Sequence, residues 1–174
     1  MFHWLEPYHV SVIVFLPFLF GLFVALCPHL KTGKALALIG SLLTFSCCFS
    51  LFHQFSKSSP HLQFYEEYSW IPQLGVKYIV GVDGLNLLLI LLTSFLFPLI
   101  LLSLFSKKQP ITGFYLALIL ALETGLLGAL VSFDLVLFYT FGQVTLLLIY
   151  LILGGWGEEK RIFATTNFIL YTGG

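Results

Sequence analysis

The chain alternates between long runs of apolar residues and short polar connections. Five runs are long enough to cross the roughly 30 Å hydrocarbon core of a bilayer, which takes about 20 helical residues. The predicted spans are residues 10–27, 35–55, 83–105, 112–131 and 134–153, followed by an incomplete sixth at 162–174. The pattern therefore predicts one polytopic membrane domain that occupies the whole of residues 1–174.

Helix is the predicted conformation of these runs. Backbone amides find no water in the hydrocarbon core, so a spanning segment must satisfy them internally, as a helix does, or in a closed barrel. A barrel strand alternates apolar and polar residues, and runs such as Leu87 to Leu92 show no alternation. The sequence thus predicts an all-α bundle of membrane helices.

Composition supports a lipid environment and excludes several classes of function. Hydrophobic residues make up 59% of the chain and charged residues 9%, with a formal net charge of zero, and a soluble domain cannot coat itself with so few polar groups. The neutral balance offers no basic face to nucleic acid. The three cysteines form no CxxC pair, the five histidines show no metal-ligand spacing, and no GxGxxG turn is present. We therefore expect no metal, iron–sulfur or dinucleotide site in this chain.

Basic residues predict the orientation of the chain. Six of the eight lie in connections on one side of the predicted bundle: Lys31, Lys34, Lys107, Lys108, Lys160 and Arg161. The opposite side carries only Lys57 and Lys77. Because Lys and Arg favour the cytoplasmic side, the N-terminus and the connection from Ser56 to Val82 are expected to face outward.

Two aspartates stand at the beginnings of predicted helices. Asp83 precedes the third span and Asp134 the fifth. A carboxylate at this place accepts hydrogen bonds from free backbone amides and faces the positive end of the helix dipole. We interpret both as structural helix caps, and Asn86, one turn further on, as a helix-packing hydrogen bonder.

Glu123 is the one acidic residue in the middle of a predicted span. It precedes Phe133, in the tight turn after its helix, by ten residues, or about 15 Å at 1.5 Å per residue. An unpaired carboxyl near the bilayer centre is expected to be neutral. Glu123 is either a protonated group that hydrogen-bonds a neighbouring helix or a residue of a proton relay. Carboxyl groups in the middle of membrane spans are rare unless they have a function, which favours the relay.

The fifth predicted helix carries a polar stripe. Gln143 follows Phe133 by ten residues, which predicts nearly the same depth as Glu123, and Tyr139 and Tyr150 share its helix face. A polar stripe is expected to face protein, where interhelical hydrogen bonds contribute about 0.6 kcal/mol each. If the two faces meet, the Gln143 amide can hydrogen-bond Glu123. Candidates for a proton path are therefore Glu123, Gln143 and Tyr139.

Four segments resemble a known family. They are Tyr78–Thr93, Phe133–Tyr139, Gly154–Gly157 and Phe168–Thr172. They are similar to the M-type antiporter-like subunit of respiratory complex I, the NADH:quinone oxidoreductase, known as subunit 4 in mitochondria. The resemblance is specific from about Trp70 to the end of the chain, which would make the chain the N-terminal part of a longer subunit. Before Trp70 only the pattern of two spans matches.

The resemblance implies a role, partners and a location. Family members are built partly from inverted repeats, which commonly place an ion path near the membrane midplane. They move protons while other subunits of the complex hold NAD, FMN, the iron–sulfur clusters and the quinone. The implied partners are the other membrane subunits and the lipid bilayer. The implied location is the bacterial inner membrane or an equivalent energy-coupling membrane.

The chain departs from the family pattern at two positions. Gln143 stands where members carry a glutamate that pairs with a lysine, and Asn167 stands where many carry a lysine, whereas Glu123 matches a glutamate of some members. Two alternatives therefore remain beside a complex I subunit. One is a subunit of a multisubunit cation/proton antiporter. The other is a truncated, inactive remnant, which Gln143 and the end at Gly174 favour.

Overall fold

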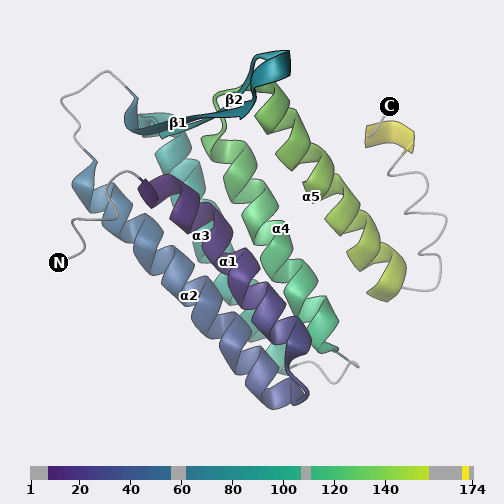
Figure 1. Ribbon diagram of the computed structural model, residues 1–174. Helices are drawn as coiled ribbons and strands as arrows, with labels where there is room; N and C mark the ends of the chain where they lie inside the picture. Colours follow the sequence, from purple (N-terminus) through teal and green to yellow (C-terminus); the bar gives the residue numbers. More distant parts are fainter. Residues whose placement is uncertain (1–7, 56–61, 107–110, 157–169, 173–174) are drawn as a thin grey trace.

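The protein is described by a computed structural model that covers residues 8–55, 62–106, 111–156 and 170–172. Five long helices and one β-hairpin make up these residues (Figure 1). The helices are α1 (His9–Leu26), α2 (Leu30–Gln54), α3 (Gly84–Ser106), α4 (Gly113–Val131) and α5 (Leu135–Trp156). The hairpin consists of β1 (Gln63–Ile71), the short 3-10 turn η2 (Pro72–Leu74) and β2 (Val76–Val82).

All five helices are long and apolar enough to cross a membrane. They lie where hydropathy predicts them, and the largest difference is at α2, which begins at Leu30 rather than at residue 35. Lys34 therefore belongs to the helix. Its Nζ donates a hydrogen bond to the backbone oxygen of Leu104 at 3.1 Å and lies 5.6 Å from the centre of the Phe105 ring. A lysine can occupy such a position because its long stem carries the charge away from the apolar core.

Helix α4 lies at the centre of the bundle and packs against each of the other four helices. It packs most extensively against α1, whereas α5 lies on the outer side and packs mainly on α4 (Figure 1). One core cluster includes Val14, Ile90 and Leu127, and a second includes Val24, Leu101 and Leu120. Because α4 packs against all four other helices, its side chains are the most enclosed of the bundle.

The hairpin lies across the end of the bundle at which α1, α3 and α5 begin (Figure 1). Its strands pair antiparallel, with Tyr68 opposite Tyr78. Gly75 closes the turn with a φ of +67°, a left-handed conformation that glycine adopts at low cost. The sequence predicted only a connection here, so the hairpin adds two short strands to a helical membrane bundle.

Main-chain hydrogen bonds tie the hairpin to the turn between α4 and α5. The amide of Phe133 donates to the oxygen of Ile79 at 2.9 Å, and Val80 forms an isolated β-bridge with Ser132. The hairpin also reaches α1, because Glu66 is 4% exposed and its Oε1 accepts a hydrogen bond from the amide of Val10 at 2.8 Å. One small sheet therefore joins segments far apart in the sequence at one end of the bundle.

Some predicted features fall outside the described residues. They include most of the predicted sixth span, of which only residues 170–172 are described and are helical. The remaining ones are the basic residues Lys57, Lys107, Lys108, Lys160 and Arg161, and also Asn167.

Candidate functional site

Glu123 lies near the middle of α4, the central helix. It follows the first residue of α4, Gly113, by ten positions and precedes the last, Val131, by eight. At a rise of 1.5 Å per residue the carboxyl group is roughly 12–15 Å from either end of the helix. Its side chain is 0% exposed. The structure therefore places an acidic side chain fully inside the bundle, close to the middle of a predicted membrane span.

Neither carboxyl oxygen of Glu123 makes a hydrogen bond to any of the described residues. No charged side chain among them acts on it either. An isolated carboxylate in a low-dielectric interior costs several kcal/mol even after relaxation, so the bundle accommodates the protonated acid. A protonated carboxyl carries one O–H donor that needs an acceptor. Glu123 is thus a buried proton-binding group with unused hydrogen-bonding capacity.

The polar neighbours of Glu123 come from α2 and α3. Ser41 of α2 acts on the carboxyl group as a hydrogen-bonding partner, although the two groups do not meet in full hydrogen-bond geometry. Cys48, two turns further along α2, lies near both Glu123 and Ser94 of α3. All four side chains are fully buried. We call Ser41, Cys48, Ser94 and Glu123 the Glu123 cluster.

Sequence reasoning missed the three partners in the Glu123 cluster. Two of them, Ser41 and Cys48, could have been found from the spacing of small residues along α2. Ala37, Ser41, Thr44 and Cys48 follow one another at intervals of four, three and four residues. Residues at this spacing share one helix face. All four are small and fully buried, which lets α2 approach α3 and α4 closely.

The faces of Gln143 and Glu123 do not meet, so the hydrogen bond that depended on this condition is not formed. Gly125 of α4 lies against Thr145, and Gly128 lies against the Phe141 ring. In this register, the α5 residue that lies at the depth of Glu123 comes about four positions after Gln143. This separation is about one helical turn, or roughly 6 Å along the helix axis. Gln143 itself is exposed on another face of α5. Counting ten residues in each direction from the turn predicted equal depths for Glu123 and Gln143. The packing of Thr145 and Phe141 against the two glycines sets the register of α4 and α5 instead, so the two depths differ.

The polar stripe of α5 points away from the described bundle. Tyr139 is 63% exposed, Tyr150 is 37% exposed, and Gln143 lies between them. The stripe was predicted to be buried against protein, and no described element covers it. The face that α5 presents to α4 carries Phe141 and Thr145 instead. Tyr139 and Gln143 therefore do not belong to the Glu123 cluster.

Asp83 and Asp134 make the hydrogen bonds of helix caps. Asp83 Oδ1 accepts from the amides of Leu85 and Asn86 at 2.9 and 2.8 Å. Asp134 Oδ1 accepts from the amides of Val136 and Leu137, both at 3.0 Å. These carboxylates satisfy backbone donors that a helix end leaves free.

Asn86 links the beginning of α3 to the end of α4. Its Oδ1 accepts from the amide of Asp83 at 2.8 Å, which completes a reciprocal cap. Its Nδ2 donates to the oxygen of Leu130 at 3.3 Å. Asn86 thus serves both as a cap partner and as a bond between two helices.

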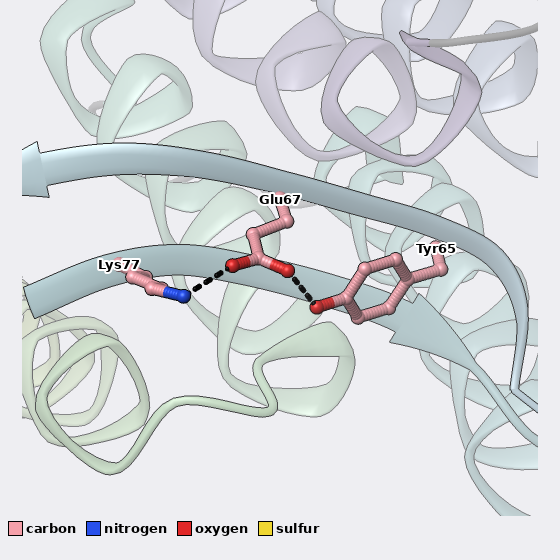
Figure 2. A network of polar contacts seen from close by, with 3 residues as sticks. All are labelled: Tyr65, Glu67 and Lys77. Atoms are coloured by element: carbon pink, nitrogen blue, oxygen red, sulfur yellow. Dashed lines mark hydrogen bonds and ion pairs between the residues drawn. The ribbon is translucent and has the colours of Figure 1, made fainter.

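A second polar group lies on the outer face of the hairpin. The Glu67 carboxylate accepts hydrogen bonds from Lys77 Nζ at 2.6 Å and from the Tyr65 hydroxyl (Figure 2). The hydrogen bonds from Lys77 and Tyr65 lower the pKa of Glu67, and the bond to Glu67 raises the pKa of both partners. All three side chains face solvent, so the network stabilises the hairpin only modestly.

The part of the chain that the structure describes brings no three His, Cys, Asp or Glu side chains together at metal-binding distance. Cys27, Cys47 and Cys48 are free thiols. The described residues therefore present a proton-binding group, Glu123, as their candidate chemistry.

Comparisons with known proteins point to a family of respiratory membrane subunits. Subunit M of the NADH-quinone oxidoreductase of Rickettsia felis is 37% identical over 171 residues, which cover 94% of this chain and 34% of the relative. Chain 4 of the chloroplast NAD(P)H-quinone oxidoreductase of Chlorokybus atmophyticus is 39% identical over 94% of this chain and 32% of the relative. No family model matches the chain.

A solved structure agrees with these relatives. One chain of respiratory complex I from Thermus thermophilus with bound NADH superimposes with a TM-score of 0.80 and 30% sequence identity. The match covers 94% of this chain and 32% of that one. The chain thus spans about a third of the length of the relatives that it matches.

Proposed function

We propose that the chain is part of an M-type antiporter-like membrane subunit of NADH:quinone oxidoreductase, and that it contributes to proton translocation coupled to electron transfer from NADH to quinone. The buried carboxyl of Glu123 carries the proposal. A group that stores a proton inside a membrane span is costly, and such groups commonly mark proton relays in pumps and transporters. Glu123 has the position, the burial and the free hydrogen-bonding capacity that such a relay uses.

The proposed role is that of a membrane subunit without redox chemistry of its own. NAD, FMN, iron–sulfur clusters and quinone are assigned to other subunits of the complex. This chain would then respond to the redox reaction through contacts with neighbouring membrane subunits. The exposed polar stripe at Tyr139, Gln143 and Tyr150 supports such contacts, because polar groups on a membrane helix favour protein over lipid.

The proposed location is the bacterial inner membrane or an equivalent energy-coupling membrane, with the N-terminus outside. Among the described residues, Lys31 and Lys34 lie at the end of the bundle opposite the hairpin, whereas Lys77 lies on the hairpin. The sequence predicts an excess of Lys and Arg on the side of the bundle that carries Lys31 and Lys34, and the positive-inside rule assigns this side to the cytoplasm.

The test is proton uptake per NADH oxidised in membrane vesicles that contain the assembled complex. Glu123→Gln keeps the size of the side chain and removes its ability to titrate, and we expect it to lower the ratio. Glu67→Gln changes a carboxyl outside the membrane and serves as the matched control with an unchanged ratio. An equal ratio in the wild type and in Glu123→Gln would remove Glu123 from the proton path.

An inactive remnant of the same family is the second candidate, and Gln143 favours it. An amide does not titrate, so the position at which the resemblance implies a glutamate carries no proton-binding group in this chain. Vesicles whose proton uptake per NADH responds to neither Glu123→Gln nor Gln143→Glu would support this alternative.

A further inference from the structure

Most buried hydroxyl groups of the bundle are bonded within their own helix. Each donates to a backbone oxygen three or four residues earlier, as Thr44 does to Gly40 at 3.0 Å and Ser94 does to Leu91 at 3.1 Å. Thr124 and Thr145 do the same. This is the usual arrangement of Ser and Thr in membrane helices. Such hydroxyls have already used their one donor proton.

Ser41 departs from this arrangement. Its Oγ is fully buried and makes no hydrogen bond to any described residue. The other buried side-chain atoms in the same condition, throughout the described part of the chain, are the two carboxyl oxygens of Glu123. Ser41 on α2 also acts on the Glu123 carboxyl of α4 as a hydrogen-bonding partner, although the two groups do not meet in full hydrogen-bond geometry. Two neighbouring buried polar groups with no other partner are natural hydrogen-bond partners, because leaving each unpaired costs about 1–3 kcal/mol.

We propose that Ser41 is the positioning residue for the Glu123 carboxyl and holds it on the α2–α3 side of α4, away from α5. The inference rests on the proposed function of Glu123 as a proton-binding group. A serine hydroxyl suits both states of a titrating acid. It accepts the O–H of the protonated carboxyl, and it donates its own O–H to the ionised carboxylate.

The packing of α4 explains why the carboxyl is held on this side. The α4 face toward α5 carries Gly125 and Gly128, and the space beside them is filled by Thr145 and the Phe141 ring. A Cβ atom added at Gly125 would come within 2.5 Å of Thr145 Oγ1. The face toward α2 offers small side chains instead, at Ala37 and Ser41. A proton that reaches Glu123 therefore does so beside Ser41, Cys48 and Ser94 of the Glu123 cluster, and not beside Gln143.

The infrared C=O stretch of protonated Glu123 tests the proposal, because its frequency rises when a hydrogen bond to the carboxyl is lost. The band is isolated as the difference between the wild type and Glu123→Gln, in the purified complex with its full-length subunit. We expect Ser41→Ala to move the band to higher frequency. Ser41→Thr, which keeps a hydroxyl, is expected to leave it near the wild-type position.

Two matched controls separate positioning from a general effect on packing. Thr44→Val removes a buried hydroxyl three residues along α2 that is bonded within its own helix, and Gln143→Leu removes the amide on α5. Both are expected to leave the band in place. A band that does not move in Ser41→Ala, a shift caused equally by Thr44→Val, or the absence of any protonated-acid band that Glu123→Gln removes would each overturn the proposal.

The infrared result is independent of proton pumping. A shifted band in Ser41→Ala together with unchanged proton uptake in Glu123→Gln would confirm the pairing of the two residues. The same result would remove the relay role, so the two proposals fail separately.

Discussion

The Glu66 carboxylate on strand β1 accepts a hydrogen bond from the backbone amide of Val10, 56 residues earlier in the sequence, at 2.8 Å. The same carboxylate accepts from the amide and the hydroxyl of Ser11. Helix α1 begins at His9 and has no side-chain cap of its own. Glu66 therefore supplies from the hairpin the carboxylate that caps α1, and its negative charge faces the positive end of that helix.

The first prediction follows from this cap. Glu66→Ala removes the acceptor for two backbone amides and is expected to destabilise the protein by about 1–2 kcal/mol, the usual cost of losing a helix cap. The measurement is thermal unfolding of the subunit in its assembled complex. Glu67→Ala, one residue away on the exposed face of β1, is the control and should stay within about 0.5 kcal/mol of the wild type. Equal losses in the two variants would show that the cap contributes nothing.

The second prediction concerns the contact between α4 and α5. A Cβ atom at Gly128 would lie 2.4 Å from the Phe141 ring, so Gly128→Ala forces the helices or the ring to move. Overpacking of this kind costs about 1–3 kcal/mol. Gly142→Ala on α5 is the control, because nothing lies within 4 Å of a Cβ added there. Thermal unfolding is expected to show a loss only for Gly128→Ala, and Phe141→Leu in the same chain should recover part of it.

The helices could be predicted from the sequence because their signal is local. A run of about 20 apolar residues is sufficient evidence for a span, and the caps at Asp83 and Asp134 are visible as an acidic residue before such a run. The depth of Glu123 follows from counting residues. Each of these features depends on residues close together in the sequence.

The faces of the helices could not be predicted in the same way. Almost all positions of α4 are apolar, so no periodic pattern marks the side of the helix that packs against α2. The sequence indicated only a connection from Ser56 to Val82, although strand β1 within it exposes Tyr65 and Glu67 and buries Glu66 between them. The partner of Glu66 lies 56 residues away, and only the folded chain brings the two together.

The third prediction is the orientation of the bundle. In a chain without its native cysteines, Lys31→Cys at the beginning of α2 should react with a membrane-impermeant thiol reagent only from the cytoplasmic side. Gln73→Cys in the hairpin turn should react only from the outside. The reason is the excess of basic residues at the end of the bundle that carries Lys31. Labelling of Lys31→Cys from outside intact cells would reverse the orientation.

The fourth prediction uses the surface network of Figure 2. The hydrogen bond from Lys77 is the largest cause of the lowered pKa of Glu67, so Lys77→Met should raise this pKa toward its ordinary value. A lowered pKa in the folded state means that the network's contribution is present above the unfolded-state pKa and is lost as pH falls through the folded-state value. An NMR titration of carboxyl-labelled Glu67 measures the shift. Identical titrations in the wild type and in Lys77→Met would contradict the network.

The last prediction separates Glu123 from Gln143. The resemblance to the M-type subunits implies a glutamate at position 143, so Gln143→Glu would introduce a titratable group there and should raise proton uptake per NADH oxidised. The structure puts this side chain about one turn from Glu123 in depth and on a face that no described element covers. The effects of Gln143→Glu and Glu123→Gln should therefore be independent, because residues without shared partners usually add within about 0.5 kcal/mol. A double-mutant cycle on proton uptake measures the coupling between them. A gain from Gln143→Glu that disappears entirely in the Glu123→Gln background would show that the two groups act in series despite their separation.

Ser41→Ala in the same cycle should couple strongly to Glu123→Gln, since a positioning residue has no effect once the carboxyl that it positions is gone.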